Sequence, residues 1–309
     1  MKIGIIGAGQ LGKDLYLRLR GQTNSTYLYS RQLGFDAKRL EVAKEIVNSN
    51  DVVINCAAMT NVDLCESEHQ DAIAANVILP QNLALLCEEH NVPFVHISTD
   101  YVYGANKIDS VLEEDMLCNP INFYGETKLI ADNYILQNNK IHLILRPSWL
   151  FGPGQNNFIY KILNKLQDAS NNSMAVVNDQ FGVPTSTSLI ADVIEAWLDG
   201  QISNGLYNIR NEIDGDGCPS RYRIADFMKE VLNSSCEIKP CSTDSFSSPA
   251  QRQKNSFLSI DKLRDELKRT EIEKFRKKYR KIYRKILNIP CWKTAVNNYV
   301  INAISESQK

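Results

Sequence analysis

Short apolar runs alternate with stretches of helical periodicity throughout the N-terminal half of the chain. Runs such as Val52-Val53-Ile54 and Leu143-Ile144-Leu145 are apolar without interruption, which is typical of strands buried on both faces of a sheet. Because the helical stretches between such runs are long enough for crossover connections, the pattern predicts a doubly wound parallel α/β sheet. The expected strands cover residues 2–6, 26–29, 51–55, 93–98 and 141–147, and the expected helices lie near 10–20, 38–49, 71–90 and 121–138.

The size and composition of the chain exclude several classes of protein. With 309 residues, 43% of them hydrophobic and 23% charged, it is a globular chain long enough for a full enzyme core. Its net charge of -1 gives no indication of nucleic-acid binding, and no apolar run approaches the ~20 residues that cross a bilayer. We therefore expect a cytoplasmic protein without a transmembrane segment. The 8 cysteines are scattered without metal-ligand spacing, so we expect neither a metal site nor disulfides.

A glycine-rich turn directly follows the first expected strand. Gly7, Gly9 and Gly12 form a G-x-G-x-x-G pattern, with Gln10 and Leu11 between the last two glycines. Glycines at these positions permit a tight turn and let the backbone approach a pyrophosphate, which the N-terminus of the following helix stabilises. An ordinary strand-to-helix turn is the alternative. The position between a strand and a helix favours dinucleotide binding, and with it a Rossmann-like fold.

The end of the second expected strand bears on which dinucleotide is bound. Folds that prefer NAD carry an acidic residue here for the ribose 2′-hydroxyl, whereas this chain has Ser30 and Arg31. The guanidinium fork of an arginine matches phosphate oxygens, so NADPH is the expected cofactor. Asp36 is close enough in the sequence to bind the adenosine of NADH, which is the alternative.

Tyr124 and Lys128 lie four residues apart in the fourth expected helix, and therefore on one of its faces. A phenol has a pKa of about 10, and a neighbouring ammonium lowers that pKa, which would make Tyr124 a proton donor near neutral pH. A surface helix pair is the alternative. Ser98, Thr99 and Asp100 follow the fourth expected strand, at the edge where open α/β sheets bind ligands, and this favours a catalytic site.

Longer segments carry a more specific signal than these short motifs. Residues 178–185 read Asn-Asp-Gln-Phe-Gly-Val-Pro-Thr, and the chain thereby resembles the dTDP-4-dehydrorhamnose reductase family, within the extended short-chain dehydrogenase/reductase superfamily. The similarity reaches to about residue 267 and resumes at 290–296. It also rests on the segments 55–63, 65–68, 98–103, 122–129, 146–149, 156–158, 205–207 and 249–258.

The resemblance implies reduction of the C4 ketone of a nucleotide-linked 6-deoxy-4-ketosugar, first of all dTDP-4-dehydro-L-rhamnose to dTDP-L-rhamnose. Tyr124 would donate the proton, Thr99 would orient the ketone oxygen, and Lys128 would bind the nicotinamide ribose and tune Tyr124. A further set of residues would bind the ligands: Gly9, Gln10 and Leu11 the pyrophosphate, Ala57, Ala58 and Met59 the cofactor cleft, and Thr60, Asp100, Trp149 and Asn157 the sugar. A loop cap is the alternative role of Asn157.

The chain departs from the family pattern near the expected substrate. Its glycine loop is one residue shorter than the usual G-x-x-G-x-x-G, and Met59, Pro147 and Gln253 stand where the family more often has His, Thr and Pro. Other functions therefore stay open. They are a reductase or epimerase-reductase for a GDP- or CDP-linked ketosugar, and a regulatory subunit resembling that of methionine adenosyltransferase, which acts by binding another protein. A homodimer is an option for the assembly.

Beyond Phe151 the alternation of strands and helices loosens, and connections rich in Gly, Asn and Ser separate shorter elements. We predict an NAD(P)-binding Rossmann domain over residues 1–151, to which elements of the C-terminal half can return. Residues 152–309 are predicted to form a smaller α/β lobe that mainly binds the substrate.

The segment from Lys268 to Lys285 carries ten Lys or Arg residues against Glu271 and Glu273, a local charge of +8. Apolar residues recur in it at three- and four-residue spacing, which predicts a basic amphipathic helix over 268–288. We expect this helix to pack on the smaller lobe with its charge in solvent. Peripheral docking to an anionic lipid surface or a partner enzyme is the alternative.

Overall fold

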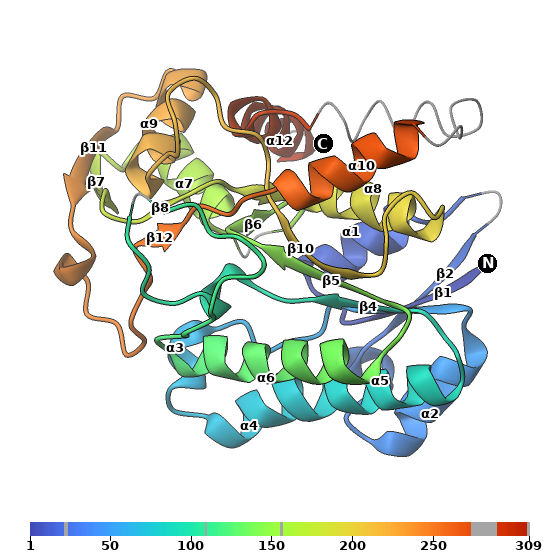
Figure 1. Cartoon of the computed structure of the whole chain (residues 1–309). Coiled ribbons are helices and arrows are strands. Elements are labelled where there is room, and N and C mark those ends of the chain that lie inside the picture. The colour runs from blue at the N-terminus through green and yellow to red at the C-terminus, as the bar shows by residue number, and fades with distance from the viewer. Residues whose placement is uncertain (22–23, 109, 155–156, 273–288, 308–309) are drawn as a thin grey trace.

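The computed structural model describes residues 1–309 apart from 22–23, 109, 155–156, 273–288 and 308–309. A central sheet of six strands runs through it, and all neighbouring strands in this sheet are parallel (Figure 1). The order is β10 (Gly205–Ile209), β5 (His142–Pro147), β4 (Phe94–Ile97), β3 (Val52–Asn55), β1 (Lys2–Ile6) and β2 (Ser25–Tyr29). This confirms the doubly wound α/β fold: the five expected strands have bounds within one residue of those predicted, whereas β10 was not expected.

Helices cover both faces of the central sheet, as Figure 1 shows. One apolar cluster joins the sheet to α1 (Gln10–Arg18), α8 (Thr187–Leu198) and α10 (Asp261–Ile272). Another joins the opposite face to α2 (Leu40–Ser49), α5 (Leu79–Glu89) and α6 (Phe123–Asn138). Strands β3 and β5 are buried along their whole length, which explains their uninterrupted apolar character.

The helix expected over 71–90 is built from three consecutive segments. They are α4 (His69–Ile73), the π-helical segment η2 (Ala74–Ile78) and α5. Periodicity alone could not show the π-helical segment, because one extra residue per turn changes the pattern only locally. This turn places Asn76, which is buried, beside the expected cofactor residues described below.

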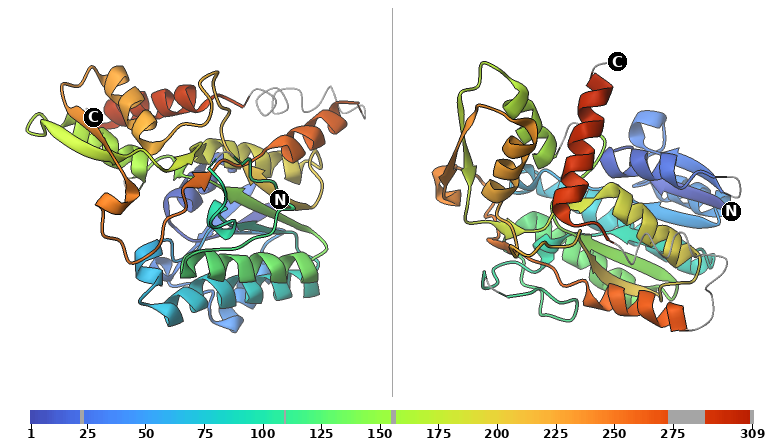
Figure 2. Two further views of the ribbon diagram at one scale, coloured as in Figure 1. Left: turned by 60° about the vertical axis from the view of Figure 1, so that its left-hand side comes forward. Right: turned by 90° about the horizontal axis from the view of Figure 1, so that it is seen from above.

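A second group of elements, from the C-terminal half, surrounds its own apolar core beside the central sheet (Figure 2). Its helices are α7 (Phe158–Gln167), α9 (Arg221–Leu232) and α12 (Trp292–Ser307). Three two-stranded sheets accompany them: β7 (Ser173–Val177) with β11 (Glu237–Cys241), β8 (Phe181–Gly182) with β12 (Asn255–Ser256), and β6 (Leu150–Phe151) with β9 (Thr185–Ser186). The remaining short helices are α3 (Val62–Cys65), η1 (Arg31–Leu33), η3 (Asp100–Val102) and η4 (Thr243–Ser245).

Three elements from beyond residue 152 belong to the central sheet and its cover. Strand β10 pairs with β5 over its whole length, α8 packs against α1, and α10 packs against β10. The division after residue 151 stays a proposal, with β10, α8 and α10 as returning elements.

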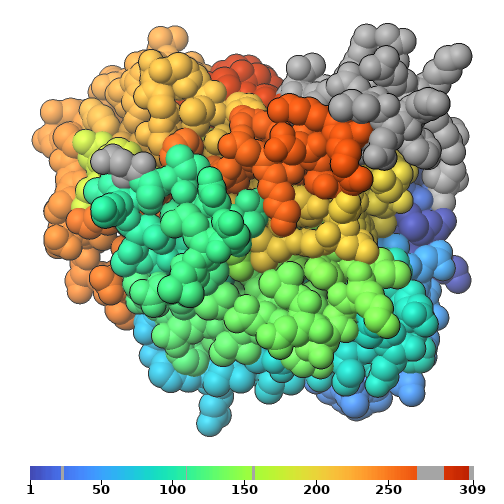
Figure 3. Space-filling model, in the orientation of Figure 1, coloured from blue at the N-terminus to red at the C-terminus, as the bar shows by residue number. Residues whose placement is uncertain are grey.

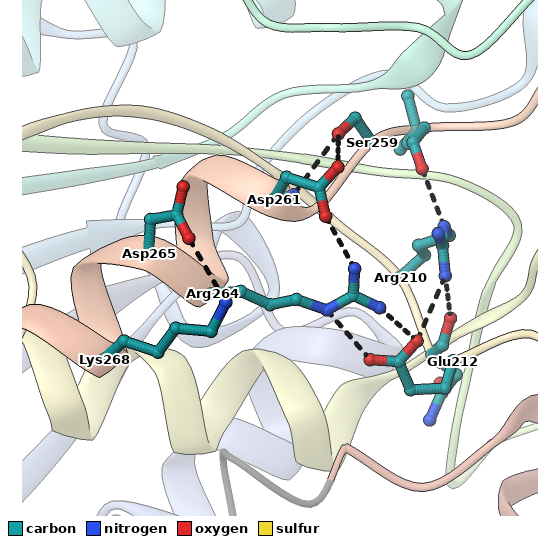
Figure 4. A network of polar contacts seen from close by, with 9 residues as sticks. Arg210, Glu212, Ser259, Asp261, Arg264, Asp265 and Lys268 are labelled. Carbon is teal, nitrogen blue, oxygen red and sulfur yellow. Dashed lines mark hydrogen bonds and ion pairs between the residues drawn. The ribbon is translucent and has the colours of Figure 1, made fainter.

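Helix α10 is attached to the chain segment after β10 by a network of charged side chains (Figure 4). The Arg264 guanidinium donates to both carboxylate oxygens of Glu212 and, at 2.6 Å, to Asp261. The Arg210 side chain donates to the Leu258 carbonyl oxygen at 2.7 Å. On the surface, α10 lies beside α8 (Figure 3).

The expected basic helix over 268–288 begins inside α10, which is helical as far as Ile272. Residues 273–288 lie outside the described part of the chain. No helix in the described residues has the length and apolar character needed to cross a membrane.

Candidate active site

The glycine turn is held in one shape by its own backbone. Gly7 has φ +104°, in the left-handed region that favours glycine, and its N–H donates to the Tyr29 carbonyl oxygen at 2.8 Å. A Cβ on Gly12 would lie 1.8 Å from the Gly7 carbonyl oxygen, so only glycine fits there. A Cβ on Gly9 would meet no atom within 4 Å, and Gly9 is the residue that precedes α1. The turn is thus open at the N-terminus of α1, where Gln10 and Leu11 begin the helix, and it fits a pyrophosphate.

The end of β2 carries unused hydrogen-bonding capacity. The Ser30 hydroxyl oxygen is buried and has no hydrogen-bond partner among the described residues. Arg31 follows it at the exposed start of η1. Asp36, the alternative adenosine ligand, accepts a hydrogen bond from the Lys38 N–H at 3.3 Å. An orphaned hydroxyl beside an exposed guanidinium fits a 2′-phosphate.

The residues that follow β3 are held by an amide that the sequence did not single out. The Asn76 side chain accepts from the Met59 N–H at 2.8 Å and donates to the Met59 carbonyl oxygen at 3.2 Å. It also donates to the Thr127 hydroxyl of α6 at 3.1 Å. Ala57 and Ala58 are half-buried and Thr60 is exposed, so this segment offers a partly open surface whose backbone is fixed.

Three polar residues follow β4, and each has a different partner. The Ser98 hydroxyl donates to Asp132 at 2.8 Å, and the Thr99 hydroxyl donates to Asp100 at 3.1 Å. Asp100 also accepts from the Gln253 side chain at 2.7 Å. Burial of Asp100 raises its pKa to about 6, although these hydrogen bonds favour the charged form. Gln253, which departs from the family pattern, is thus the partner of an expected sugar-facing residue.

Helix α6 brings Tyr124 and Lys128 to the carboxyl end of β4, where Thr99 and Asp100 lie. It begins after Asn122, whose side chain accepts from the Gly125 N–H at 2.9 Å as an N-cap. Tyr124 is 8% exposed and Lys128 is 1% exposed. Lys128 Nζ donates to the Ile97 carbonyl oxygen at 2.7 Å.

The effect of Lys128 on Tyr124 differs from the expectation. Burial raises the pKa of Tyr124 above its ordinary value, and contact with the Thr99 side chain is what lowers it. Burial also lowers the pKa of Lys128 to about 8. The structure shows no lowering of the Tyr124 pKa by Lys128: burial has the largest effect on that pKa, and the Lys128 amine donates to the Ile97 carbonyl oxygen of β4.

Trp149 lies under an arginine that sequence reasoning missed. The Arg221 guanidinium carbon lies 4.2 Å from the centre of the Trp149 ring and 5.0 Å from that of Phe158. Its Nε donates to the Gln180 side-chain oxygen at 2.8 Å, an acceptor that carries no charge of its own. Burial lowers the pKa of Arg221, while the charges of Tyr101 and Asp100 raise it. In the sequence, Arg221 is only the first residue of a helix after Ser220, which gave no signal.

A second arginine reaches the same neighbourhood. Arg252 forms an ion pair with Asp63 at 2.6 Å, and its charge lowers the pKa of both Tyr101 and Arg221. Tyr101 packs edge-on against Tyr124, with ring centres 5.7 Å apart. Two cations therefore lie near Asp100 and Tyr101.

Asn157 is a helix cap in this structure. Its side chain accepts from the Tyr160 N–H at 2.8 Å at the start of α7, and donates to the Gln10 side-chain oxygen at 2.9 Å. Gln10, expected at the pyrophosphate, and Asn157, expected at the sugar, thus contact each other. The expected contact of Asn157 with the sugar stays a prediction.

Known proteins similar to this chain identify its family. A family model described as the RmlD substrate binding domain matches residues 1–288. The chain belongs to the RmlD substrate binding domain family. The dTDP-4-dehydrorhamnose reductase of Mycolicibacterium smegmatis is 31% identical over 259 residues, covering 84% of this chain and 78% of the relative. That of Escherichia coli K12 is 31% identical over 280 residues, covering 85% and 90%.

Solved structures of RmlD family members show the same fold over the whole chain. A dTDP-4-dehydrorhamnose reductase from Clostridium acetobutylicum matches with a TM-score of 0.85 and 30% identity, covering 99% of this chain and 100% of the other. The Bacillus anthracis enzyme in complex with NADP matches with a TM-score of 0.84 and 26% identity, covering 97% and 99%.

In the described part of this chain, no cluster of His, Cys, Asp and Glu side chains could hold a metal ion.

Proposed function

We propose that this RmlD family member is an NADPH-dependent reductase of the C4 ketone of a nucleotide-linked 6-deoxy-4-ketosugar, with dTDP-4-dehydro-L-rhamnose as substrate and dTDP-L-rhamnose as product. One observation carries the proposal: Thr99, Asp100, Tyr124 and Lys128 gather at the carboxyl edge of β4 beside the open glycine turn. Relatives named as this reductase support the substrate. A relative named as a spore coat polysaccharide biosynthesis protein, 30% identical over 260 residues, supports a role in surface polysaccharide synthesis.

The cofactor would lie along the glycine turn, with the end of β2 at its adenosine. Gly7, Gly9 and Gly12 would leave the turn open to the pyrophosphate, and Ser30 with Arg31 would bind the 2′-phosphate. When bound, NADPH supplies the hydride that reduces the ketone carbon.

The side chains of this protein supply the proton and hold the ketone. Reduction develops negative charge on the ketone oxygen, and Tyr124 gives its phenol proton to that oxygen as the general acid. The raised pKa of Tyr124 keeps the phenol protonated before the reaction. The Thr99 hydroxyl, which donates to Asp100 in this structure, would turn its single proton to the ketone oxygen when the substrate binds and so orient the ketone.

The two arginines fit the diphosphate that joins the sugar to its nucleoside. Arg221 offers a guanidinium whose Nε donates to the uncharged side chain of Gln180, and Arg252 adds a second cation. Guanidinium groups bind phosphate oxygens through paired hydrogen bonds. With Asp100 and Trp149 at the sugar, this arrangement orders the substrate from ketone to nucleotide along the site.

The test is turnover of NADPH by the purified full chain with dTDP-4-dehydro-L-rhamnose. We expect loss of NADPH absorbance with formation of dTDP-L-rhamnose, and a higher kcat/KM with NADPH than with NADH. Turnover of a GDP- or CDP-linked ketosugar alone would replace the nucleotide in the proposal. Absence of turnover with all of these, in a folded protein that binds NADPH, would point to a regulatory subunit.

A further inference from the structure

A buried chain of polar groups runs beneath the site from β3 to α6. The Ala57 N–H donates to Asn55 Oδ1 at 3.1 Å, and Asn55 Nδ2 lies 3.2 Å from His96 Nδ1. His96 Nε2 lies 3.0 Å from Lys128 Nζ, which donates to the Ile97 carbonyl oxygen at 2.7 Å. Asn55, His96 and Lys128 are each at most 1% exposed. The proton positions in this chain are therefore fixed by its own donors and acceptors.

At the Ala57 end of this series of hydrogen-bonded groups, the proton position is fixed because a backbone N–H can only donate. The Ala57 N–H requires the oxygen of the Asn55 amide, which turns the Asn55 NH₂ group toward His96. An NH₂ group also only donates, so His96 Nδ1 must be the bare, accepting nitrogen. Burial holds the pKa of His96 well below its usual value, so the imidazole is neutral and carries one proton. That proton must be on Nε2, where it faces Lys128 Nζ.

At the Lys128 end of this series, the hydrogen bonds depend on the charge of Lys128. A neutral amine has one lone pair, which accepts from His96 Nε2–H, and two N–H groups, one of which donates to the Ile97 carbonyl oxygen. An ammonium has three donors and no lone pair, so it would place two donors face to face. If the imidazole proton moves to Nδ1, that N–H faces the NH₂ group of Asn55, again donor against donor. If the Asn55 amide then rotates, its NH₂ group faces the Ala57 N–H instead. Every arrangement with an ammonium leaves one buried conflict, and the amine leaves none.

The charged and titratable groups around Lys128 do not reverse this preference. Asp132, one turn further along α6, raises the pKa of Lys128; its Oδ2 accepts from Arg146 at 3.0 Å and from the Ser98 hydroxyl, and its buried Oδ1 has no hydrogen-bond partner among the described residues. Cys56 also raises it, but burial raises the pKa of the Cys56 thiol to about 12, so the thiol is neutral. Burial, the largest influence, lowers the pKa of Lys128 to about 8, in the same direction as the proton arrangement.

We propose that His96 is a positioning residue for Lys128: its Nε2–H tautomer, fixed by Asn55 and Ala57, donates to Nζ and favours the neutral amine of Lys128 over the ammonium. The consequence for catalysis rests on the proposed function. A neutral Lys128 leaves Tyr124 protonated, which is the state from which a proton donor must start. It also leaves one N–H of Lys128 for a ligand hydroxyl.

The first test is the tautomer of His96, measured by nitrogen NMR of the full chain with labelled histidine. The chain has 4 histidines, so replacement of the other three, His69, His90 and His142, one at a time assigns the His96 signals by elimination. We expect a protonated Nε2 and a bare Nδ1 at about pH 9, above the Lys128 pKa of about 8, where Lys128 is mostly the amine. A protonated Nδ1, or a doubly protonated ring, would overturn the proposal. This measurement needs no substrate, so it stands or falls independently of the reductase activity.

The matched variant is Asn55→Asp, which has the same shape but replaces the NH₂ donor with an acceptor. A carboxylate would accept from both the Ala57 N–H and His96 Nδ1–H, so the imidazole proton should move to Nδ1 and Nε2 should accept from a Lys128 ammonium. His96→Gln is the second variant, because its amide oxygen can accept from the ammonium directly. An unchanged tautomer in folded Asn55→Asp would show that Asn55 does not set it, and would contradict the proposal.

The second readout is the pH dependence of kcat/KM. In both variants the pH midpoint that belongs to Lys128 should rise by at least about one unit, since removal of one buried conflict favours the ammonium about tenfold or more. A purely structural role for His96 would lower activity at every pH without moving the midpoint, and that result would also overturn the proposal. Circular dichroism and thermal unfolding verify that each variant is folded.

Discussion

At the residue scale, burial determines the chemistry of this site more strongly than neighbouring charge does. Tyr124 and Lys128 lie one helical turn apart, as expected from their spacing, but their pKa values move in opposite directions away from ionisation. The same desolvation raises the pKa of Asp100 to about 6. Burial therefore disfavours the charged form of each group, and it keeps the Tyr124 phenol protonated, which suits a site that must donate a proton to a ketone.

Replacement of Tyr124 by phenylalanine tests the proton donor. We expect Tyr124→Phe to lower kcat by at least ~100-fold, because general acid catalysis contributes about that much, with the affinity for NADPH nearly unchanged. Steady-state kinetics and a cofactor titration by fluorescence measure the two effects. A variant that retains near-wild-type kcat would exclude Tyr124 as the donor.

The arginine at the start of α9 tests the diphosphate site. Arg221→Met should weaken binding of dTDP by about 10- to 100-fold, the range for one lost charge-assisted hydrogen bond in a buried place, and should raise KM more than it lowers kcat. Binding of thymidine should change little. Arg223→Met is the matched control, because Arg223 is on the same helix but its side chain is 41% exposed and pairs with Asp216 and Asp226. Equal losses for dTDP and thymidine would contradict the assignment to phosphate.

Asp100 gives a prediction for the pH dependence of stability. Its pKa in the folded protein, about 6, is above its value in the unfolded chain, so the folded state binds more protons between about pH 4 and 6. Stability from this group is present at low pH and is lost as the pH rises through 6. Asp100→Asn does not titrate, so its unfolding free energy relative to wild type should increase by on the order of 2–3 kcal/mol from pH 4 to 7. Urea unfolding at several pH values measures this, and a pH-independent difference would refute it.

At the element scale, the ends of strands and the starts of helices form the site, and local irregularities in one helix and one turn orient its side chains and backbone. The π-helical segment η2 points Asn76 at Met59 and Thr127, and the glycine turn leaves the start of α1 open. Neither feature is periodic. Both occur where a helix meets the cofactor side of the sheet, in keeping with the tendency of π-helical turns to occur at functional sites.

Two glycines of the turn should respond differently to the same substitution. Gly12→Ala would place a Cβ 1.8 Å from the Gly7 carbonyl oxygen, so we expect both a lower melting temperature and loss of NADPH binding. Gly9→Ala meets no atom within 4 Å, so it should keep its melting temperature within a few degrees while weakening NADPH binding. Thermal unfolding with and without NADPH separates the two. Unchanged NADPH binding by Gly9→Ala would place the pyrophosphate elsewhere.

The sequence predicted the parts of the site that depend on local pattern. Strand and helix periodicity, the glycine turn and the Tyr124–Lys128 spacing are short-range features, and the structure has the expected elements. Arg221, Gln253 and Asn76 could not be found in this way, because their importance comes from partners distant in the sequence. Gln253, for example, donates to Asp100, 153 residues earlier. The shift of the Tyr124 pKa was missed because burial is a property of the folded chain.

At the scale of the whole molecule, contacts between distant segments connect the two cores. Asn157 donates to Gln10 across 147 residues, and Arg252 to Asp63 across 189 residues. Strand β10 and helices α8 and α10 complete the central sheet and its cover from beyond residue 152. The two apolar cores are therefore joined by side-chain contacts and by shared elements as well as by the backbone.

A fragment of residues 1–151 tests how far the N-terminal part is independent. Without β10, one edge of β5 loses its parallel partner, and without α8 the apolar face around α1 is uncovered. We expect this fragment to be insoluble or to lack a cooperative thermal transition, in contrast to the full chain. Circular dichroism melting and size-exclusion chromatography decide the matter. A soluble fragment with a sharp transition would establish residues 1–151 as a domain that folds alone.

The late position of β10 in the chain also affects how the protein is made. Strand β5 leaves the ribosome ahead of residues 148–204, and these must follow before β10 can cover the open edge. At a synthesis rate of about 5–20 residues per second, this edge of β5 stays without its partner strand for roughly 3 to 11 seconds. During that interval the edge is a template for pairing with other nascent chains. The strand order of the finished sheet therefore gives the growing polypeptide a period in which it depends on chaperones.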